Sequence, residues 1–535
     1  MTNEKPFTVF VSVYDKDGLD VFLWELAKAN RNVRFISSGG TAEFIRKAGL
    51  CVTSVEELTG QRSILDGRVK TLVPQLYGAV LAKDTPGHDA DRAAYNIGWI
   101  DMGIMGFYPL ESEIAKSSST EESVTEQTDV GGPSFVHACA KGRRLILCKR
   151  SQWPEALERL RAGTANDPEY RRRLAATAEY EVAKYLMASA RYLSGGGYEA
   201  VFGERVRTLK YGENAWQTPA HHYATDGRDP LALHNFKLVE GNPSHTTMTD
   251  LDRSLQTLSH IAVALEARGY KEKRIAVGCK HGNACGSSLM HEDTNVAVSN
   301  MLLGNLQAIF GGAIILNFPV SGKEAHQLLH FRSEKRRPID VVAAPSFTDE
   351  AIEELHRKEG KCKLFENPAL ACSTLDMAQR FRYVRGGFLT QPNYMFVLDL
   401  SAPYVTKHGA ATPDQELDML LAWAIGSTSN SNKITLVKYC QLIGNGVSQQ
   451  SRVEAAELAL LKVKYSGDVP SGAVAYSDSF FPFPDGPKVL IEAGIRAILT
   501  TSGSVRDKET IELCQKSNVP LYMIPDEVGR GFFGH

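Results

Sequence analysis

Short apolar runs alternate with amphipathic stretches through the first third of the chain. Residues 7–13, 33–37, 50–55, 77–83 and 101–107 are apolar runs of strand length. Residues 16–30 and 41–49 place apolar side chains at helical spacing instead. Strands that alternate with helices are typical of a parallel sheet with helices on both faces. A charged helical stretch from 154 to 193 is expected to pack outside this sheet.

The glycine-rich stretch at 194–199 interrupts the pattern and is the best candidate for a domain boundary. We therefore expect one α/β domain over residues 1–195 and a second over residues 196–535. The second domain divides into two successive α/β units near 385–400. Its expected strands cover residues 274–280, 308–317, 339–345, 394–400, 433–439, 471–478 and 495–503.

The length, charge and cysteine pattern of the chain limit its possible domain count, binding partners and cellular location. A chain of 535 residues has room for two to four domains, and its formal net charge of -2 favours neither nucleic acid nor a membrane. No uninterrupted apolar run reaches about 18 residues, so no transmembrane helix is expected. The first residues also lack a basic stretch followed by an apolar run, so we expect no secretory signal. Nine cysteines without a CxxC pair indicate reduced thiols and a cytoplasmic protein. Any anionic substrate must then be met by local cations.

Two polar turns follow strands of the first domain. The sequence SSGGT places Ser38, Gly40 and Thr41 between a strand and a helix, where free backbone N–H groups and hydroxyls can hold an anion. Ser12 and Lys16 lie at an equivalent strand end, where the first strand leads into a helix. Ligands of such sheets bind outside the carboxyl ends of the strands, so these turns predict a phosphate site. A plain strand-to-helix turn is the alternative.

Further polar groups stand near tight turns. If residues 67–74 form a strand, Arg68 and Lys70 point to the same side and could face a ligand together. The alternative is a cationic strand edge that is exposed to solvent. Tyr108, Asp129 and Lys141 follow in glycine-rich surroundings. In the second domain Lys280 and His281 precede a Gly-Asn-Ala-Cys-Gly turn. A lone Lys-His pair is usually a solvated loop, so its neighbours decide its interpretation.

The order of these motifs carries a family resemblance. SSGGTAEFIRKAG, ELTGQRSILDGRVKTL, FYPL, TDVGGPS and CAK resemble the cyclohydrolase half of the bifunctional AICAR transformylase/IMP cyclohydrolase family, where AICAR is 5-aminoimidazole-4-carboxamide ribonucleotide and IMP is inosine monophosphate. The resemblance implies a methylglyoxal-synthase-like fold. It also implies that Ser12, Lys16, Ser38, Gly40 and Thr41 hold the nucleotide phosphate, and that Arg68, Lys70, Thr71, Tyr108, Asp129 and Lys141 surround the closing ring. Lys70 and Arg68 would stabilise developing oxyanion charge, while Asp129 and Lys141 would move protons and tune each other's pKa.

The second domain is similar to the transformylase half of the same family, with a tandem cytidine-deaminase-like fold. KHGNACG resembles the transformylase signature, with Lys280 and His281 as the centre of formyl transfer and Asn432 as the best match to the family's catalytic asparagine. The resemblance implies that Lys210, Tyr211, Phe310, Gly311 and Arg530 bind the substrate. It implies that Gln449, Asp478, Phe480 and Phe481 bind the folate. Lys210 replaces an arginine of the family, and Gly531 stands where the family has another, next to Arg530.

The combined resemblance predicts a cytoplasmic homodimer that makes the last two steps to IMP. The second domain would transfer formyl from 10-formyltetrahydrofolate to AICAR, and the first would close the ring with loss of water. We expect no metal cofactor, because the zinc pattern of true deaminases is absent. Two alternatives remain: a homologue with one activity or another formyl donor, and a non-catalytic protein that binds purine nucleotides.

Overall fold

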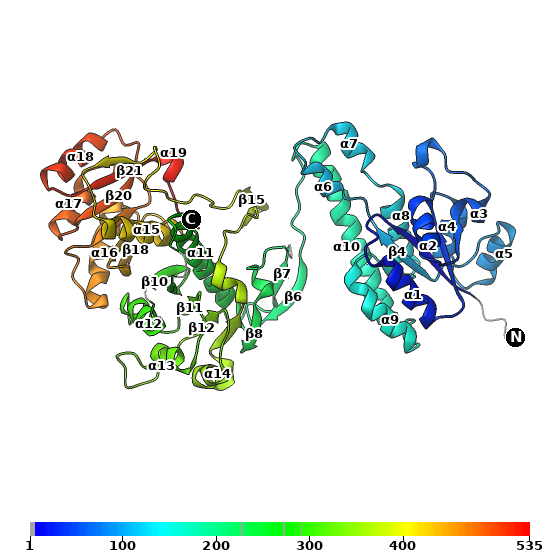
Figure 1. Cartoon of the computed structure of the whole chain (residues 1–535), viewed down its shortest axis with the longest axis horizontal. Coiled ribbons are helices and arrows are strands. Elements are labelled where there is room, and N and C mark those ends of the chain that lie inside the picture. The colour runs from blue at the N-terminus through cyan, green and yellow to red at the C-terminus, as the bar shows by residue number, and fades with distance from the viewer. Residues whose placement is uncertain (1–5, 226–227, 271–272, 290–291, 535) are drawn as a thin grey trace. The chain divides into compact units, whose positions relative to one another are not determined.

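The computed structural model describes residues 6–225, 228–270, 273–289 and 292–534. They form two compact units, one up to Phe202 and one from Gly203 onward, and Figure 1 shows each with its own sheet. No helix within the described ranges is both long and apolar enough to cross a membrane.

The N-terminal unit is built on a five-stranded sheet in the order β3-β2-β1-β4-β5, with every neighbouring pair parallel. Its strands are β1 (Phe7–Val13), β2 (Val33–Ser37), β3 (Val52–Ser54), β4 (Met102–Gly106) and β5 (Leu145–Leu147). The helices are α1 (Leu19–Ala29), α2 (Gly39–Lys47), α3 (Val55–Thr59), α4 (Pro74–Leu81), α5 (Pro86–Ala94), α6 (Leu110–Ile114), α7 (Glu121–Glu126), α8 (Gly131–Lys141), α9 (Trp153–Arg161) and α10 (Pro168–Leu193). The predicted parallel α/β fold of this unit is confirmed.

Two local predictions in this unit are wrong. The apolar run at 77–83 lies mainly in helix α4, where Leu76, Ala79 and Val80 are buried at helical spacing. Pro74 at the start of that helix indicates a helix rather than a strand, since the fixed φ of proline suits the first helical turn. Residues 67–74 form no strand either, apart from one bridge between Ile64 and Val69.

The C-terminal unit holds a 12-stranded mixed sheet in the order β16-β21-β20-β19-β17-β18-β10-β9-β11-β12-β13-β8. It contains two repeats of the same order: helix, hairpin, helix, strand, helix, strand, helix, strand. The first is α11 (His245–Ala267), β9 (Ala276–Lys280), β10 (Asn283–Ser288), α12 (Thr294–Leu303), β11 (Ala313–Leu316), α13 (Gly322–His330), β12 (Val341–Ala344), α14 (Asp349–Leu355) and β13 (Lys363–Glu366). The second is α15 (Pro413–Ser427), β17 (Ile434–Lys438), β18 (Gln441–Gly446), α16 (Arg452–Ser466), β19 (Val474–Ser477), α17 (Asp485–Glu492), β20 (Ala497–Ser502), α18 (Asp507–Lys516) and β21 (Leu521–Pro525).

The remaining elements of this unit are β6 (Glu204–Leu209), β7 (Ala220–Ala224), β8 (Lys237–Glu240), the hairpin β14 (Arg380–Val384) and β15 (Gly387–Gln391), β16 (Thr406–His408) and α19 (Asp526–Gly529). The expected strand at 394–400 is absent. Leu398 and Leu400 are buried there, but the segment pairs with no strand in the described part of the chain.

Both faces of the central strands are buried. In β11, Ala313 and Ile315 pack into a core that includes residues of α11 and α15, whereas Ile314 and Leu316 pack into one with α12, α13 and α14. This explains the continuous apolar runs in the sequence, because a strand covered on both faces has no polar side. The repeats meet where β10 pairs antiparallel with β18.

Candidate active sites

A cavity of about 530 Å³ opens at the carboxyl ends of the strands of the N-terminal unit. It gathers all the predicted residues of this unit except Lys141. These residues are Ser12, Lys16, Ser38, Gly40, Thr41, Arg68, Lys70, Thr71, Tyr108 and Asp129. They come from the ends of β1, β2 and β4 and from the turns before α4 and α8, as the rule for open α/β sheets requires.

One side of the cavity is suited to an anion. Ser38 precedes α2 but does not cap it, and its buried Oγ has no hydrogen-bond partner among the described residues. Thr41 donates its hydroxyl to the oxygen of Val13 at 3.1 Å, which holds the start of α2 against β1. The helix start therefore presents backbone N–H groups and a spare hydroxyl to the cavity.

The other side carries proton-handling groups. Asp129 Oδ1 accepts the backbone N–H of Gly132 at 2.9 Å, and Tyr185 Oη accepts that of Asp129 at 2.7 Å. Burial raises the pKa of the Asp129 carboxyl, and the N–H of Gly132 and the charge of Lys70 offset only part of this rise. Lys70 Nζ lies 3.4 Å from Tyr108 Oη. The cavity thus joins a cation, a phenol and a carboxyl that is easy to protonate.

In the C-terminal unit, Lys280 ends β9, and His281 and Gly282 form the turn that leads into β10. His281 has a φ of 52° and Gly282 one of 72°, so the chain reverses in two left-handed residues. Asp250 of α11 accepts the backbone N–H of Gly282 at 2.8 Å and holds the turn. Lys280 Nζ donates to the backbone oxygen of Phe310, which brings Phe310 and Gly311 beside the turn.

The second repeat contains an equivalent turn. Tyr439 and Cys440 between β17 and β18 also have positive φ angles, 52° and 58°. Asp418 of α15 accepts their N–H groups at 3.0 and 2.7 Å. Lys438 precedes this turn as Lys280 precedes the first, but its ammonium pairs with Asp468 at 2.8 Å. The pair Lys-His therefore belongs to one repeat alone.

A hydrogen bond links the first turn to the segment before β17. The backbone N–H of Asn430 donates to Asn283 Oδ1 at 3.0 Å. Two residues on, Asn432 Nδ2 donates to the backbone oxygens of Gln449 and Gln450 at 3.1 and 3.2 Å. The structure thus brings Asn432 and Gln449 together and places their segment against the hairpin of Lys280 and His281.

Comparison with known proteins agrees with these features. The family model for the AICARFT/IMPCHase bienzyme matches residues 140–462, and that for the MGS-like domain matches residues 22–134. The bifunctional purine biosynthesis protein PurH of Cutibacterium acnes is 33% identical over 540 residues, covering 98% of both chains. PurH of a Nostoc species is 32% identical over 484 residues, covering 89% of this chain and 90% of the relative. The chain belongs to the AICARFT/IMPCHase bienzyme family.

Membership in this family makes the chain a bifunctional enzyme of purine biosynthesis. A solved structure, that of ForH, is 26% identical and covers 36% of this chain and 100% of its own, with a TM-score of 0.33.

Several bienzyme-family predictions need correction against the geometry. Lys141 does not line the N-terminal cavity, because it ends α8 whereas Asp129 precedes the start of that helix. At 1.5 Å per residue, Gly131 and Lys141 at the two ends of this helix lie roughly 15 Å apart along its axis. The groups that lower the pKa of Asp129 are the backbone N–H of Gly132, the charge of Lys70 and the backbone N–H of Gly131, so the expected mutual tuning with Lys141 stays a prediction.

Two predicted folate contacts are covered by protein. Phe481 is 2% exposed and packs into the core of the second repeat, which leaves Phe480 as the half-buried aromatic of the pair. Asp478 is fully buried and binds Lys433, Arg452 and Ser431. Burial alone would raise the pKa of Asp478, but the two cations and the hydroxyl outweigh it and hold that pKa below its usual range.

Arg530 lies on the surface rather than in the site. Its guanidinium pairs with Asp526 at 3.5 Å and lies over the ring of Phe532. An arginine could not replace Gly531 in this packing, because a Cβ there would lie 2.4 Å from Tyr394 Oη and 2.8 Å from Ser427 Cβ. Lys210 is exposed and Tyr211 half-buried, and the backbone of both pairs with Pro243 and His245 around the start of α11.

The sequence reasoning missed Lys433. Its ammonium is completely buried, donates to the backbone oxygen of Gly531 at 2.8 Å and lies 3.3 Å from Asp478 Oδ2. Burial lowers the pKa of Lys433 to about 8 despite the attraction of Asp478. This cation lies at the point where the C-terminal segment meets the segment of Asn432. The one available signal was Gly531, which stands where the related family has an arginine.

Proposed function

We propose that this enzyme makes the last two steps to IMP, with formyl transfer in the C-terminal unit and ring closure in the N-terminal unit. The observation that carries the proposal is the similarity to PurH proteins over nearly the whole chain, which covers both units. The proposed formyl donor is 10-formyltetrahydrofolate, as the resemblance implies.

For ring closure, we assign the phosphate of formyl-AICAR to the start of α2. Ser38 supports this assignment because its buried hydroxyl gains a partner when a phosphate oxygen lies there. Ser12, Gly40, Thr41 and Lys16 line the same side of the cavity and would complete the anion site. The phosphate would fix the imidazole ring toward Lys70, Tyr108 and Asp129.

The ring then closes between two substituents of one molecule. The carboxamide nitrogen attacks the formyl carbon and a C–N bond forms. The C–O bond then breaks, and the formyl oxygen leaves as water with one proton from the carboxamide nitrogen and one from the 5-amine nitrogen. Lys70 would stabilise the oxyanion that develops on the formyl oxygen. Asp129 would accept the proton of the attacking nitrogen and return one to the departing oxygen, and the raised pKa of its carboxyl favours that exchange. Holding the substituents in contact supplies part of the rate.

For formyl transfer, we assign the reacting groups to the first hairpin turn. The 5-amine of AICAR attacks the formyl carbon, the bond to N10 of the folate breaks, and a proton passes from the amine to N10. His281 is suited to relay that proton, and Lys280 to stabilise the tetrahedral oxyanion. Asn432, joined to this hairpin through its segment, would orient the amine or the formyl group. Lys433 would give that segment the positive charge that the family places elsewhere.

Folate and nucleotide contacts follow the same assignment. Lys210, Tyr211, Phe310 and Gly311 would bind AICAR, and Gln449 and Phe480 would face the folate. Asp478 would act through Lys433 and Arg452, since it has no exposed surface of its own.

We also propose that the enzyme is a cytoplasmic homodimer. All nine cysteines are free, in keeping with a reducing compartment. The hairpin β14–β15 extends from the body of its unit (Figure 1) and exposes Tyr383 by 81% and Leu389 by 59%. A two-stranded hairpin is at best marginally stable alone, and exposed apolar patches mark interfaces. A second copy of this chain would cover it, and sedimentation at micromolar concentration tests the stoichiometry.

The deciding experiment incubates the whole chain with AICAR and 10-formyltetrahydrofolate and follows formyl-AICAR and IMP separately. Both products are expected. Formyl-AICAR that forms only with formyl phosphate would overturn the proposed donor. Absence of IMP from supplied formyl-AICAR would overturn the cyclohydrolase assignment. Binding of AICAR without any turnover would overturn both.

A further inference from the structure

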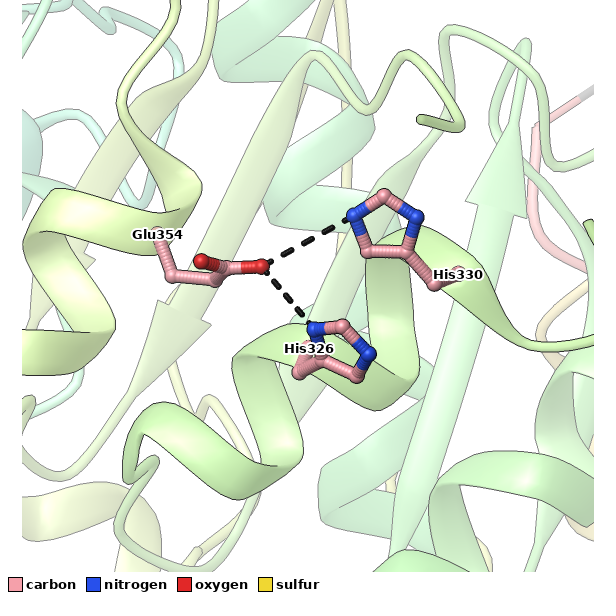
Figure 2. Close-up of side chains that lie close together, drawn as sticks. All are labelled: His326, His330 and Glu354. Carbon is pink, nitrogen blue, oxygen red and sulfur yellow. Dashed lines mark hydrogen bonds and ion pairs between the residues drawn. The ribbon is translucent and has the colours of Figure 1, made fainter. Parts of the chain in front are cut away.

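Two histidines and a glutamate converge on the surface of the C-terminal unit, among residues that neither candidate site uses. His326 and His330 lie one turn apart on α13, and Glu354 lies on the neighbouring helix α14. Figure 2 shows both imidazoles turned toward the carboxylate of Glu354. His326 Nδ1 lies 3.2 Å and His330 Nε2 3.7 Å from the same oxygen, Glu354 Oε1.

These separations suit a tetrahedral metal ion. Zinc binds imidazole nitrogen and carboxylate oxygen at about 2.0–2.2 Å, so two ligand atoms of a tetrahedral site lie roughly 3.4 Å apart. The three ligand atoms of the cluster all lie within 4.8 Å of one another. Small rotations of the side chains would therefore place an ion between them, without any movement of the helices.

The donor set selects the class of metal. Two imidazoles and one carboxylate are ligands of zinc and of neighbouring first-row ions, whereas magnesium and calcium require oxygen ligands. Histidines at i and i+4 lie on the same face of a helix, which is how zinc-binding helices present them. Without an ion, the cluster is a pair of surface contacts worth little to stability.

The two helices that carry the ligands are held in place by their packing against the core. Leu328 and Leu329 of α13 and Leu355 of α14 are buried in one core with β11 and β12. The side chains above this core stay open to water: His326 is 67% exposed, Glu354 36% and His330 30%. Water can therefore fill the remaining position of a tetrahedral ion.

We propose that His326, His330 and Glu354 bind a zinc-class divalent cation that ties α13 to α14. A ligand that binds the folded chain alone stabilises it, so the ion raises the melting temperature of the C-terminal unit. The ion binds apart from both reactions and is not a cofactor of either.

Full-length enzyme without an affinity tag, stripped of metal with a chelator, is titrated with zinc chloride against a colorimetric zinc indicator. One zinc per chain is expected, with a higher melting temperature at saturation. Cobalt in place of zinc should give the visible absorption bands of tetrahedral coordination. The variants His330→Ala and Glu354→Gln should each weaken binding at least about tenfold, because each removes a direct ligand and even a supporting residue is worth that much.

The matched control is His356→Ala. His356 is another exposed histidine beside a glutamate, 2.9 Å from Glu240, but it lies outside the cluster. Its loss should leave zinc affinity unchanged. Equal weakening by His356→Ala and His330→Ala would overturn the proposal, as would the absence of saturable binding. Displacement of the zinc by equimolar magnesium would overturn the assigned metal class.

Discussion

The ammonium of Lys433 donates to the backbone oxygen of Gly531 across 2.8 Å, although 98 positions separate the two residues. The bond fastens the C-terminal segment to the segment before β17, where Asn432 lies. The same ammonium lies 3.3 Å from Asp478, so one buried cation contacts both a backbone carbonyl and a carboxylate.

Replacement of Lys433 by methionine would keep most of the volume and remove the charge. Breaking a buried ion pair costs about 3–5 kcal/mol, and Arg452 and Ser431, which also bind Asp478, would offset part of that cost here. We expect a lower melting temperature, loss of formyl transfer, and unchanged cyclisation of supplied formyl-AICAR. Calorimetry and the two assays measure this. The control Arg530→Ala breaks only a surface pair and should change neither property. Wild-type formyl transfer in Lys433→Met would show that the cation is dispensable.

The two equivalent hairpin turns provide an internal control for the proposed site of formyl transfer. Lys280→Ala and His281→Ala should each lower formyl transfer at least about a hundredfold, the usual contribution of a positioned proton-transfer group. Both should spare cyclisation. Lys438→Ala removes the equivalent lysine of the second repeat and should leave formyl transfer near the wild-type rate. If all three variants lose formyl transfer equally, the lysines act through the fold and not at the reacting atoms.

Asp129 predicts the pH dependence of cyclisation. A carboxylate base works only when ionised, so the rate falls as pH drops through its pKa. Burial raises that pKa, which places the acidic limb above the usual range of aspartate. Lys70 holds the pKa down, so Lys70→Ala should move the limb to higher pH as well as lower the maximal rate. The profile of kcat/KM against pH measures both effects. A limb that stays in place in Lys70→Ala would remove Lys70 from the surroundings of Asp129.

A methyl group at Gly132 tests the position of the Asp129 carboxylate. A Cβ there would lie 2.2 Å from Asp129 Oδ2, so the carboxylate must move. Gly132→Ala should lower cyclisation at least about tenfold, since a displacement of about 1 Å at a reacting group is costly.

Gly87→Ala is the matched control. Gly87 is the second residue of α5, as Gly132 is of α8, and a Cβ there meets nothing within 4 Å. Gly87→Ala should keep the wild-type rate. Equal rates in both variants would place the reaction away from Asp129.

The polar turns that follow strands of the N-terminal unit could be predicted from sequence, because their signal lies in a few consecutive residues. Ser12 lies at the end of β1, and Ser38 and Thr41 lie between the end of β2 and the first turn of α2. Parallel strands bring such strand ends to one edge of the sheet. Lys141 could not be placed in this way. Its distance from Asp129 depends on residues 131–141 forming a helix. Asp129 lies before the start of that helix and Lys141 at its end, so the two are far apart in space although they are close in sequence.

Lys433 could not be predicted for a different reason. A lysine at the start of an apolar strand normally faces water, and here the segment that covers it comes from the end of the chain. Phe481 is the opposite case. Its motif identifies the segment correctly, but local sequence does not say which aromatic of a Phe-Phe pair turns into the core.

The repeated turns also separate architecture from chemistry. Asp250 and Asp418 hold turns whose backbones share left-handed φ angles, yet the side chains at the two turns differ. The turn of the second repeat could therefore receive the proposed catalytic pair Lys-His by substitution. Its backbone geometry is already present, and an engineer would need to change side chains only, beginning with Tyr439→His and the release of Lys438 from Asp468.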